Sequence, residues 1–223
     1  MLSQIESTTL WDFPKQNYGD TPHGNNKYNG VTPAFVIWNL LQRYTKEGDL
    51  VVDPMCGSGT TIDVAKELKR KVIGYDLNIV RPDVIKNDSR RIPLQEDSVD
   101  FVFIDSPYSD NIKYSDDKQC IGKISCEKTE FYNELDKTAT EIKRILKPGK
   151  VIGWVIADQW IKKKFTATGF LMWQRLERHF EPIDIICLTR HNQTSNTDIW
   201  HSRARQYNFY LRGFKYLFIM RKF

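Results

Sequence analysis

The stretch from Asp49 to Asp76, DLVVDPMCGSGTTIDVAKELKRKVIGYD, decides the fold. Its first part, Asp49–Asp53, is short, β-branched and followed by proline, which predicts a buried strand. Gly57 to Thr61 predicts a tight turn, and Ile62–Lys69 carries apolar residues at helical spacing. Lys71–Asp76 is a second short apolar strand that ends in an acid. Strand and helix therefore alternate within this stretch.

The alternation continues through the rest of the chain. Helices are predicted over Val31–Tyr44 and Phe131–Leu146, and strands over Asp100–Asp105, Val151–Ala157, Ile183–Leu188 and Phe209–Ile219, the last split by Gly213. Strands that are apolar almost throughout belong to a parallel sheet covered on both faces. The sequence predicts a doubly wound α/β fold with a mostly parallel sheet, helices on both faces and an antiparallel pair of C-terminal strands.

Length and composition limit the class of protein. The 223 residues suit one domain, 1–223, with a sizeable core, and 40% hydrophobic with 27% charged residues argues against a disordered or fibrous chain. No basic region precedes a long apolar stretch at the N-terminus, so we expect a cytoplasmic protein without a membrane partner. Cys56, Cys120, Cys126 and Cys187 lack C-x2-C spacing, which favours reduced thiols and no metal.

Positive charge is concentrated near the C-terminus. The net charge is +5, but residues 161–223 hold 12 basic and 4 acidic residues, which leaves −3 for residues 1–160. A one-sided positive field attracts polyanions such as nucleic acids, although a basic excess is also common on solvated surfaces.

Three predicted strands end in acids, namely Asp53, Asp76 and Asp105. Ligands of open α/β sheets bind outside the carboxyl ends of the strands, so a shared pocket explains all three acids better than separate loop or cap roles. Asp76 follows Gly57 by 19 residues, close to the spacing at which an acid binds a ribose. The pattern favours an adenosine-containing ligand. It lacks the phosphate loop and the complete G-x-G-x-x-G of nicotinamide enzymes.

The turn Asp105-Ser106-Pro107-Tyr108 follows the third of these strands. Proline restricts the backbone, so an acid beside a fixed carbonyl can accept both protons of an exocyclic amine. Tyr108 can stack on the planar base that carries the amine, as enzymes acting on a flipped-out base require. A simple β-turn with a tyrosine lid remains the alternative.

These motifs resemble those of the S-adenosylmethionine-dependent amino methyltransferases of DNA, which modify adenine N6 or cytosine N4. DPMCGSGTT (53–61) resembles the family's cofactor motif D-P-F-x-G-S-G-T-T, and DSPY (105–108) resembles its catalytic D-P-P-Y or S-P-P-Y. Residues 23–45 are similar to its N-terminal motif, and the match covers most of 23–158 and 207–222. The resemblance implies a Rossmann-like methyltransferase fold, S-adenosylmethionine as cofactor and double-stranded DNA as partner, and it leaves open whether a separate restriction nuclease accompanies the protein.

The resemblance also assigns roles to residues. The catalytic set is Asp105, Ser106, Pro107 and Tyr108. The cofactor-binding set is Thr32, Asp53, Pro54, Cys56, Gly57, Ser58, Gly59, Thr60, Asp76 and Asp88, the last lying where the family contacts the adenine ring of the cofactor. Ser106 replaces the family's usual first proline. The register of Asp105 favours adenine N6 over cytosine N4.

Target recognition is assigned to two segments, 109–128 and 159–206. The nucleic-acid-binding candidates are Lys162, Lys163, Lys164, Arg190, Asn192, Arg203 and Arg205. Arg and Asn can contact base edges and Lys mainly phosphates, while a solvated surface role remains open for each. Trp160 and Trp200 are the tryptophans to test for base stacking.

The sequence is thus interpreted as that of a site-specific DNA methyltransferase that acts on a flipped base, at adenine N6. The alternatives are a cytosine-N4 DNA methyltransferase, an RNA guanine-N2 methyltransferase, a protein glutamine methyltransferase, and an inactive nucleic-acid-binding subunit.

Overall fold

One eight-stranded sheet forms the centre of the computed structural model, which describes residues 5–25, 30–191 and 197–223. In chain order the elements are β1 (Leu10–Trp11), α1 (Ala34–Tyr44), β2 (Leu50–Asp53), α2 (Thr60–Glu67), β3 (Lys71–Asp76), β4 (Val84–Lys86), β5 (Val99–Asp105), η1 (Ile121–Lys123), α3 (Thr129–Ile145), β6 (Leu146–Ile156), β7 (Gln159–Ile161), β8 (Lys164–Thr166), α4 (Thr168–Leu176), β9 (Glu181–Thr189), α5 (Asp198–Gln206) and β10 (Phe214–Arg221).

The strands lie in the order β1-β9-β10-β6-β5-β2-β3-β4. All neighbouring strands are parallel except the two pairs that β10 forms with β6 and β9. Only β10 therefore runs against the other strands of this sheet. The predicted mostly parallel sheet with an antiparallel C-terminal pair is confirmed.

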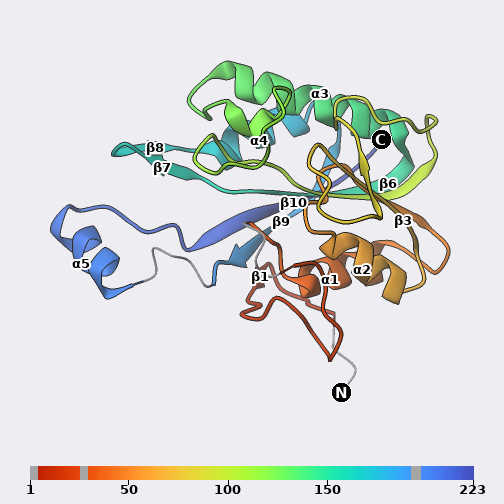
Figure 1. Ribbon diagram of the computed structural model, residues 1–223, viewed down its shortest axis with the longest axis horizontal. Coiled ribbons are helices and arrows are strands. Elements are labelled where there is room, and N and C mark those ends of the chain that lie inside the picture. Colours follow the sequence, from red (N-terminus) through yellow and green to blue (C-terminus); the bar gives the residue numbers. More distant parts are fainter. Residues whose placement is uncertain (1–4, 26–29, 192–196) are drawn as a thin grey trace.

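Helices cover both faces of the sheet (Figure 1). α1 and α2 lie together on one face, and α3 and α4 lie together on the other. The apolar side chains of each helix recur every three or four residues and are buried, as Ile37 and Leu41 are in α1 and Leu135 and Ile142 are in α3. Burial of these stripes against the sheet makes the core of the doubly wound α/β fold that the sequence predicts.

The order of the central strands places the three strand-end acids side by side. β2 lies between β3 and β5, because the chain adds β3 and β4 on one side of β2 and then crosses over to place β5 on the other. Asp53, Asp76 and Asp105 end three adjacent parallel strands, so all three lie along the same edge of the sheet. The reversal of strand order at β2 is the place where open α/β sheets form a ligand crevice.

Two predicted boundaries differ from the structure. α3 ends at Ile145 and β6 begins at once, so Pro148 and Gly149 lie inside an irregular strand with a shifted register instead of in a loop. The prediction of a strand over residues 209–213 is wrong, because β10 begins at Phe214. The apolar residues of 209–213 line a cavity, described below, and their hydrophobicity does not reflect a place in the sheet.

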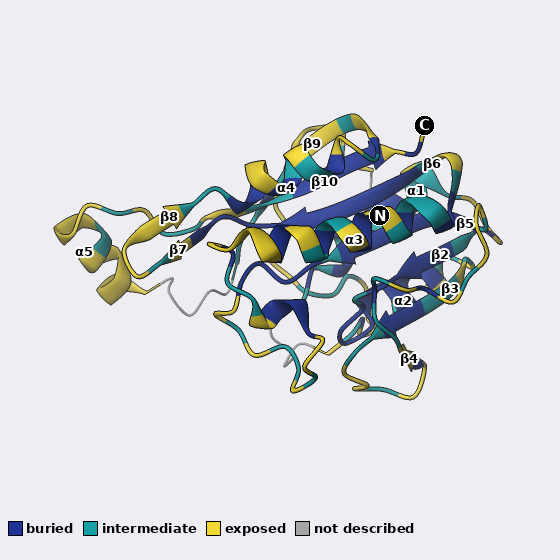
Figure 2. Cartoon of the chain, turned by 90° about the horizontal axis from the view of Figure 1, so that it is seen from above, coloured by how far each residue is buried: buried dark blue, intermediate teal, exposed yellow. Residues whose placement is uncertain are grey.

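Several short elements are absent from the sequence prediction. They are β1, β4, η1, the β7–β8 hairpin, α4 and α5. None of the residues of α5 is buried, so α5 lacks the apolar stripe that reveals a helix in a sequence. The hairpin and α5 extend from the same side of the molecule and are largely exposed (Figure 2). No helix within the described residues is long and apolar enough to cross a membrane.

Gly74, within β3, leaves room for one side chain from the loop that follows β2 and one from helix α2. A Cβ at this position would lie 2.5 Å from Ile62 Cδ1 and 2.9 Å from Cys56 Sγ. Since both distances are below van der Waals contact, we expect Gly74→Ala to lower the free energy of unfolding by about 1–3 kcal/mol, the usual cost of overpacking. Urea unfolding followed by circular dichroism measures this change.

Gly213→Ala is the matched control, because a Cβ at Gly213 meets nothing within 4 Å. We expect its free energy of unfolding to stay within about 0.5 kcal/mol of the unmodified protein. If both variants lost the same free energy of unfolding, the loss could not be assigned to the close packing of Ile62 and Cys56 against Gly74.

Candidate active site

A cavity of about 1310 Å3 lies at the carboxyl ends of the central strands. All four predicted catalytic residues line it, and so do all predicted cofactor-binding residues except Gly59. The structure therefore brings together two motifs that lie far apart in the sequence. Their roles stay predictions.

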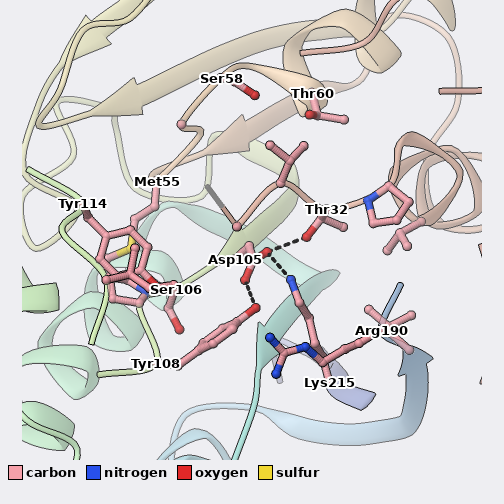
Figure 3. Close-up of a pocket in the computed structure, with 18 of the residues that line it drawn as sticks. Thr32, Met55, Ser58, Thr60, Asp105, Ser106, Tyr108, Tyr114, Arg190 and Lys215 are labelled. Carbon is pink, nitrogen blue, oxygen red and sulfur yellow. Dashed lines mark hydrogen bonds and ion pairs between the residues drawn. The ribbon is translucent and has the colours of Figure 1, made fainter. Parts of the chain in front are cut away.

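Asp105, at the end of β5, is held by three side chains (Figure 3). The Thr32 hydroxyl and the Lys215 ammonium group donate to Oδ2, at 2.5 and 3.3 Å, and the Tyr108 hydroxyl donates to Oδ1 at 2.6 Å. These donors fix the plane of the carboxylate, and Oδ1, which accepts only from Tyr108, keeps acceptor capacity for a further donor. Asp105 is thus oriented as an acceptor that faces the cavity.

Tyr108 does not project as an exposed stacking face. Its side chain is 7% exposed, and its hydroxyl is bonded to Asp105. Burial, with the negative charge of Asp105 as the next cause, raises the pKa of Tyr108, so the hydroxyl remains a donor. The Lys215 ammonium lies 5.4 Å from the centre of the ring. A base that stacks on Tyr108 has to approach the part of the ring that borders the cavity.

Ser106 is fixed through its side chain. Its hydroxyl accepts a hydrogen bond from Trp154 Nε1 at 3.1 Å and donates to the Val155 carbonyl at 3.4 Å. Both partners belong to β6, so the hydroxyl ties the turn to the core. This bonding restrains the position where the related motif carries a proline. Only the backbone of Ser106 is left to act on a ligand.

The glycine-containing loop after β2 is organised by Asp53. Its carboxylate accepts hydrogen bonds from the Met55 N–H at 3.1 Å and the Thr61 hydroxyl at 2.6 Å. Gly59 precedes α2 with a φ of 84°, a conformation that glycine adopts without strain. Burial raises the pKa of Asp53 to about 7, against the opposing effect of both hydrogen bonds. Part of the Asp53 population is consequently protonated near neutral pH.

Asp76 closes the loop from the neighbouring strand. It accepts hydrogen bonds from the Gly57 N–H and the Asn78 N–H, each at 2.9 Å. Burial raises its pKa, and the hydrogen bonds from Asn78 and Gly57 oppose the rise. The carboxylate therefore stands beside the turn that opens α2.

Arg81 also holds this loop, through the Ser58 carbonyl, and its role was not predicted from the sequence. Its guanidinium forms a two-pronged contact with Asp63, at 2.8 and 2.9 Å, and donates to the Ser58 carbonyl at 3.3 Å. Asp63 also accepts from the Gly24 N–H at 2.8 Å. The pair thereby joins the loop to the N-terminal segment. An arginine in a polar stretch carries no sequence signal for such a role.

Two further residues of the predicted cofactor set, Asp88 and Cys56, also have their side chains bonded or packed within the protein. Asp88 is bonded by Arg90 Nη2 at 2.5 Å and by the Arg90 N–H at 3.0 Å, and Arg90 also contacts Glu134. The Cys56 thiol packs in a small apolar cluster with Ile62 and Val84. All four cysteines are free thiols. The Cys56 N–H donates to the Tyr75 carbonyl at 2.9 Å and the Cys56 carbonyl accepts from the Gly59 N–H at 2.8 Å, so this residue shapes the loop.

Charge divides the cavity in two. Asp53, Asp76 and Asp88 lie on the side of β2, β3 and β4. Arg190, Arg212 and Lys215 lie on the side of β9 and β10. The remaining charged residues of the lining are Lys15, Lys113, Asp105 and Asp158. An acidic half suits a cationic ligand and a basic half suits a polyanion, with Asp105 at the border.

Lys215 is the main site residue that the sequence analysis missed. It stands in β10 among apolar residues, within the stretch FKYLFIM, and only 13% of its side chain is exposed. A single charge in an otherwise apolar strand was the available signal, because a buried charge requires a partner. Asp105 is that partner, across 110 positions of sequence.

The predicted nucleic-acid residues are spread around the cavity. Arg190 lines it, whereas Lys162 and Lys163 form the turn of the β7–β8 hairpin, Lys164 begins β8, and Arg203 and Arg205 belong to α5. Asn192 lies outside the described residues. The predicted recognition segment 109–128 places Gln119, Cys120 and Ile121 in the cavity wall. Among the residues that the structure describes, no cluster of His, Cys, Asp or Glu could hold a metal ion.

Solved methyltransferases share the fold. Geranyl diphosphate C-methyltransferase from Streptomyces coelicolor A3(2), in complex with Mg2+, geranyl diphosphate and S-adenosyl-L-homocysteine, gives a TM-score of 0.56 at 14% identity, over 85% of this chain and 79% of that one. TrmN from Thermus thermophilus gives 0.56 at 15% identity, over 87% of this chain and 50% of the other. The Rossmann-like methyltransferase fold is confirmed.

Curated relatives match in sequence. The type II methyltransferase M2.DpnII of Streptococcus pneumoniae is 48% identical over 50 residues, which are 22% of this chain and 19% of that protein. The type II methyltransferase M.MwoI of Methanothermobacter wolfeii is 29% identical over 129 residues, 54% of this chain and 19% of that protein. The chain spans less than a third of the length of such relatives.

A family model supports the same relationship. The model N6_N4_Mtase, DNA methylase, matches residues 3–87, which include the N-terminal motif and the glycine-containing loop. Together with the relatives, this match confirms the resemblance of the chain to the S-adenosylmethionine-dependent DNA amino methyltransferases.

Proposed function

We propose that this chain transfers the methyl group of S-adenosylmethionine to an exocyclic amine of a DNA base, at adenine N6. The observation that carries the proposal is the position of Asp105, an oriented acceptor at the border between the acidic and basic halves of one cavity. The partial match to the DNA methylase model supports the same activity.

The acidic half of the cavity fits the cofactor. S-adenosylmethionine carries a sulfonium and an ammonium group against one carboxylate, so Asp53 and Asp76 favour it electrostatically. A dinucleotide would instead bring a negatively charged pyrophosphate toward these carboxylates. Asp76 stands where a ribose acceptor is needed, and the loop at Gly57 and Ser58 offers backbone close to the ligand. These residues would hold the cofactor.

When bound, the cofactor supplies an electrophilic methyl group. The acceptor amine is a poor nucleophile, because its lone pair is delocalised into the base. Asp105 Oδ1 and the Ser106 carbonyl would accept its two N–H groups, which holds the lone pair in line for attack. The amine shares Oδ1 with the Tyr108 hydroxyl or replaces it, since a carboxylate oxygen accepts two hydrogen bonds.

Adenine N6 is preferred over cytosine N4 on the register of the catalytic turn, in which Asp105 takes the place of the family's aspartate or serine. Cytosine N4 is the second candidate, because the same pair of acceptors suits either amine. A separate restriction nuclease as partner, with double-stranded DNA as substrate, completes the proposal.

DNA is expected to lie on the basic half of the cavity and on the hairpin. Lys162 and Lys163 occupy the hairpin turn with φ values of 50° and 65°, a left-handed conformation that costs free energy in residues other than glycine. Both side chains are exposed at this tip. Two-residue hairpin turns with positive φ usually have the sequence Asn-Gly. Binding of DNA phosphates would explain why lysines occupy both positions here.

We expect Asp105→Ala to lower the single-turnover rate of methyl transfer by about 100-fold or more, since the carboxylate acts as the transition state forms. Tritiated S-adenosylmethionine and excess bacterial genomic DNA, which contains every short site, measure the rate. Mass spectrometry of the digested DNA then identifies the product as N6-methyladenine or N4-methylcytosine.

Asp110→Ala is the control for this variant, because Asp110 is exposed and follows the same turn. Its rate should stay within twofold of the unmodified protein, and calorimetry should show that both variants bind the cofactor. A normal rate for Asp105→Ala would refute the mechanism. N4-methylcytosine as the product would show that the target base is cytosine and not adenine. The proposed methyl transfer to an exocyclic amine would still hold.

The hairpin lysines should contribute to the salt dependence of DNA binding. For duplex DNA, the slope of log K against log salt becomes shallower by about 0.9 for each phosphate that the protein no longer neutralises. We expect the triple variant with Lys162, Lys163 and Lys164 changed to Gln to reduce the slope by about 1–3, measured by fluorescence anisotropy.

The control changes Lys46, Lys69 and Lys71 to Gln, because these exposed lysines lie at the opposite edge of the sheet, where the parallel strands begin. The control should leave the slope unchanged. Slopes that are indistinguishable between the two triple variants would show that the hairpin tip is only a solvated surface.

A further inference from the structure

We infer that the outer part of the cavity is a stacking site for unpaired bases next to the target nucleotide. The inference deepens the proposed function and rests on it. The strand that enters the site is then unpaired over several nucleotides, instead of at the single base that is methylated.

Four aromatic side chains surround the outer part of the cavity, namely Trp160, Trp200, Phe209 and Tyr210. Trp160 and Phe209 stack on each other, with ring centres 6.0 Å apart and planes 13° from parallel. Trp160 is 38%, Trp200 40% and Tyr210 81% exposed. Large aromatic rings are mostly buried in folded proteins, and a group of exposed ones around a single cavity is typical of a binding site for a ligand with flat apolar faces.

The rings come from what we call the arm, residues 159–166 and 197–213, which includes the β7–β8 hairpin and α5 (Figures 1 and 2). Its two parts touch, because Trp160 packs on Phe209 and the Arg212 guanidinium lies 5.3 Å from the centre of the Phe165 ring. No residue of α5 is buried. These contacts hold the two parts of the arm together, and the exposed fractions of Trp160, Trp200 and Tyr210 show that their rings remain accessible.

Charge identifies the occupant. The arm holds six Lys or Arg residues and one acid, Asp198. Arg203 lies over the Trp200 ring at 5.1 Å, so cationic groups and aromatic rings alternate on this surface. A second copy of the chain would bring the same positive charge against it. A polyanion with flat rings, which is a nucleic-acid strand, matches both features.

An unpaired strand fits the rings better than a duplex does. In a duplex each base face is covered by the neighbouring base pair, so a side-chain ring reaches a face only where the stack is opened. Proteins that bind single strands combine aromatic rings with a positive groove in this way. The cavity joins these rings to Asp105, which allows the flanking bases and the target base to be bound together.

The test compares binding of a labelled single-stranded 12-mer of thymidines with binding of a duplex of equal length. We expect Tyr210→Leu and Trp200→Leu to weaken single-strand binding about tenfold each, the loss typical of one stacked base. Duplex binding should change less than twofold. Tyr210 is largely exposed, so its replacement does not disturb the core.

Tyr207→Leu is the matched control, because Tyr207 is 66% exposed on the same arm and does not line the cavity. Its single-strand affinity should equal that of the unmodified protein. Unchanged single-strand affinity in both the Tyr210 and Trp200 variants would overturn the inference. Sedimentation that shows loss of a dimer in these variants, with DNA affinity unchanged, would overturn it too and assign the arm to a second copy.

Methyl transfer to native and to heat-denatured genomic DNA separates this inference from the proposed function. If the unmodified protein methylates DNA but the Tyr210 and Trp200 variants bind the single strand normally, the stacking site is contradicted and the proposed function is not. Methylation of neither DNA by the unmodified protein contradicts the proposed function, while the binding measurements still decide the stacking site. We expect denatured DNA to be methylated at least as fast as native DNA.

Discussion

The carboxylate of Asp53 is the contact on which the site depends. It is buried at the end of the central strand β2 and accepts hydrogen bonds from the Met55 N–H and the Thr61 hydroxyl. These two bonds fix the conformation of the loop between Met55 and Thr61. A buried carboxylate without these donors would be left with its desolvation cost uncompensated. Strand, glycine turn and helix α2 are therefore linked through one side chain, and Asp76 supports the turn from the neighbouring strand.

The remaining parts of the site are fixed by groups distant in sequence. Asp105 is positioned by Thr32 before α1 and by Lys215 in β10, which are on opposite sides of it in the chain. Ser106 is tied to β6, and Arg81 ties the glycine-containing loop to the N-terminal segment. The catalytic turn therefore requires the whole sheet to be assembled, including the antiparallel strand β10.

The elements and turns that the sequence predicts correctly are those in which a local pattern of residues determines the backbone conformation. Strand β3, Lys71–Asp76, was predicted with the observed bounds, because a short run rich in β-branched residues between charged ends is typical of a buried strand. The glycine turn and the DSPY turn were located because their residue types are needed for their backbone. Exposed α5 escaped prediction because it buries no apolar stripe. Lys215 escaped because its partner lies in another strand, and residues 209–213 misled because their apolar side chains face a cavity instead of a sheet neighbour.

The acids that end the strands couple folding to ligand charge. Since burial raises the pKa of Asp53 from 3.8 to about 7, the folded state retains a proton that the unfolded chain releases between these values. The contribution of Asp53 to stability therefore falls as the pH rises through that window, and the raised pKa of Asp76 acts in the same direction. A cation seated beside these carboxylates would offset this loss, because a ligand that binds only the folded state stabilises it by mass action. Above that window Asp53 is ionised in the protein without a ligand, so the effect of a bound cation on this part of the stability is largest there.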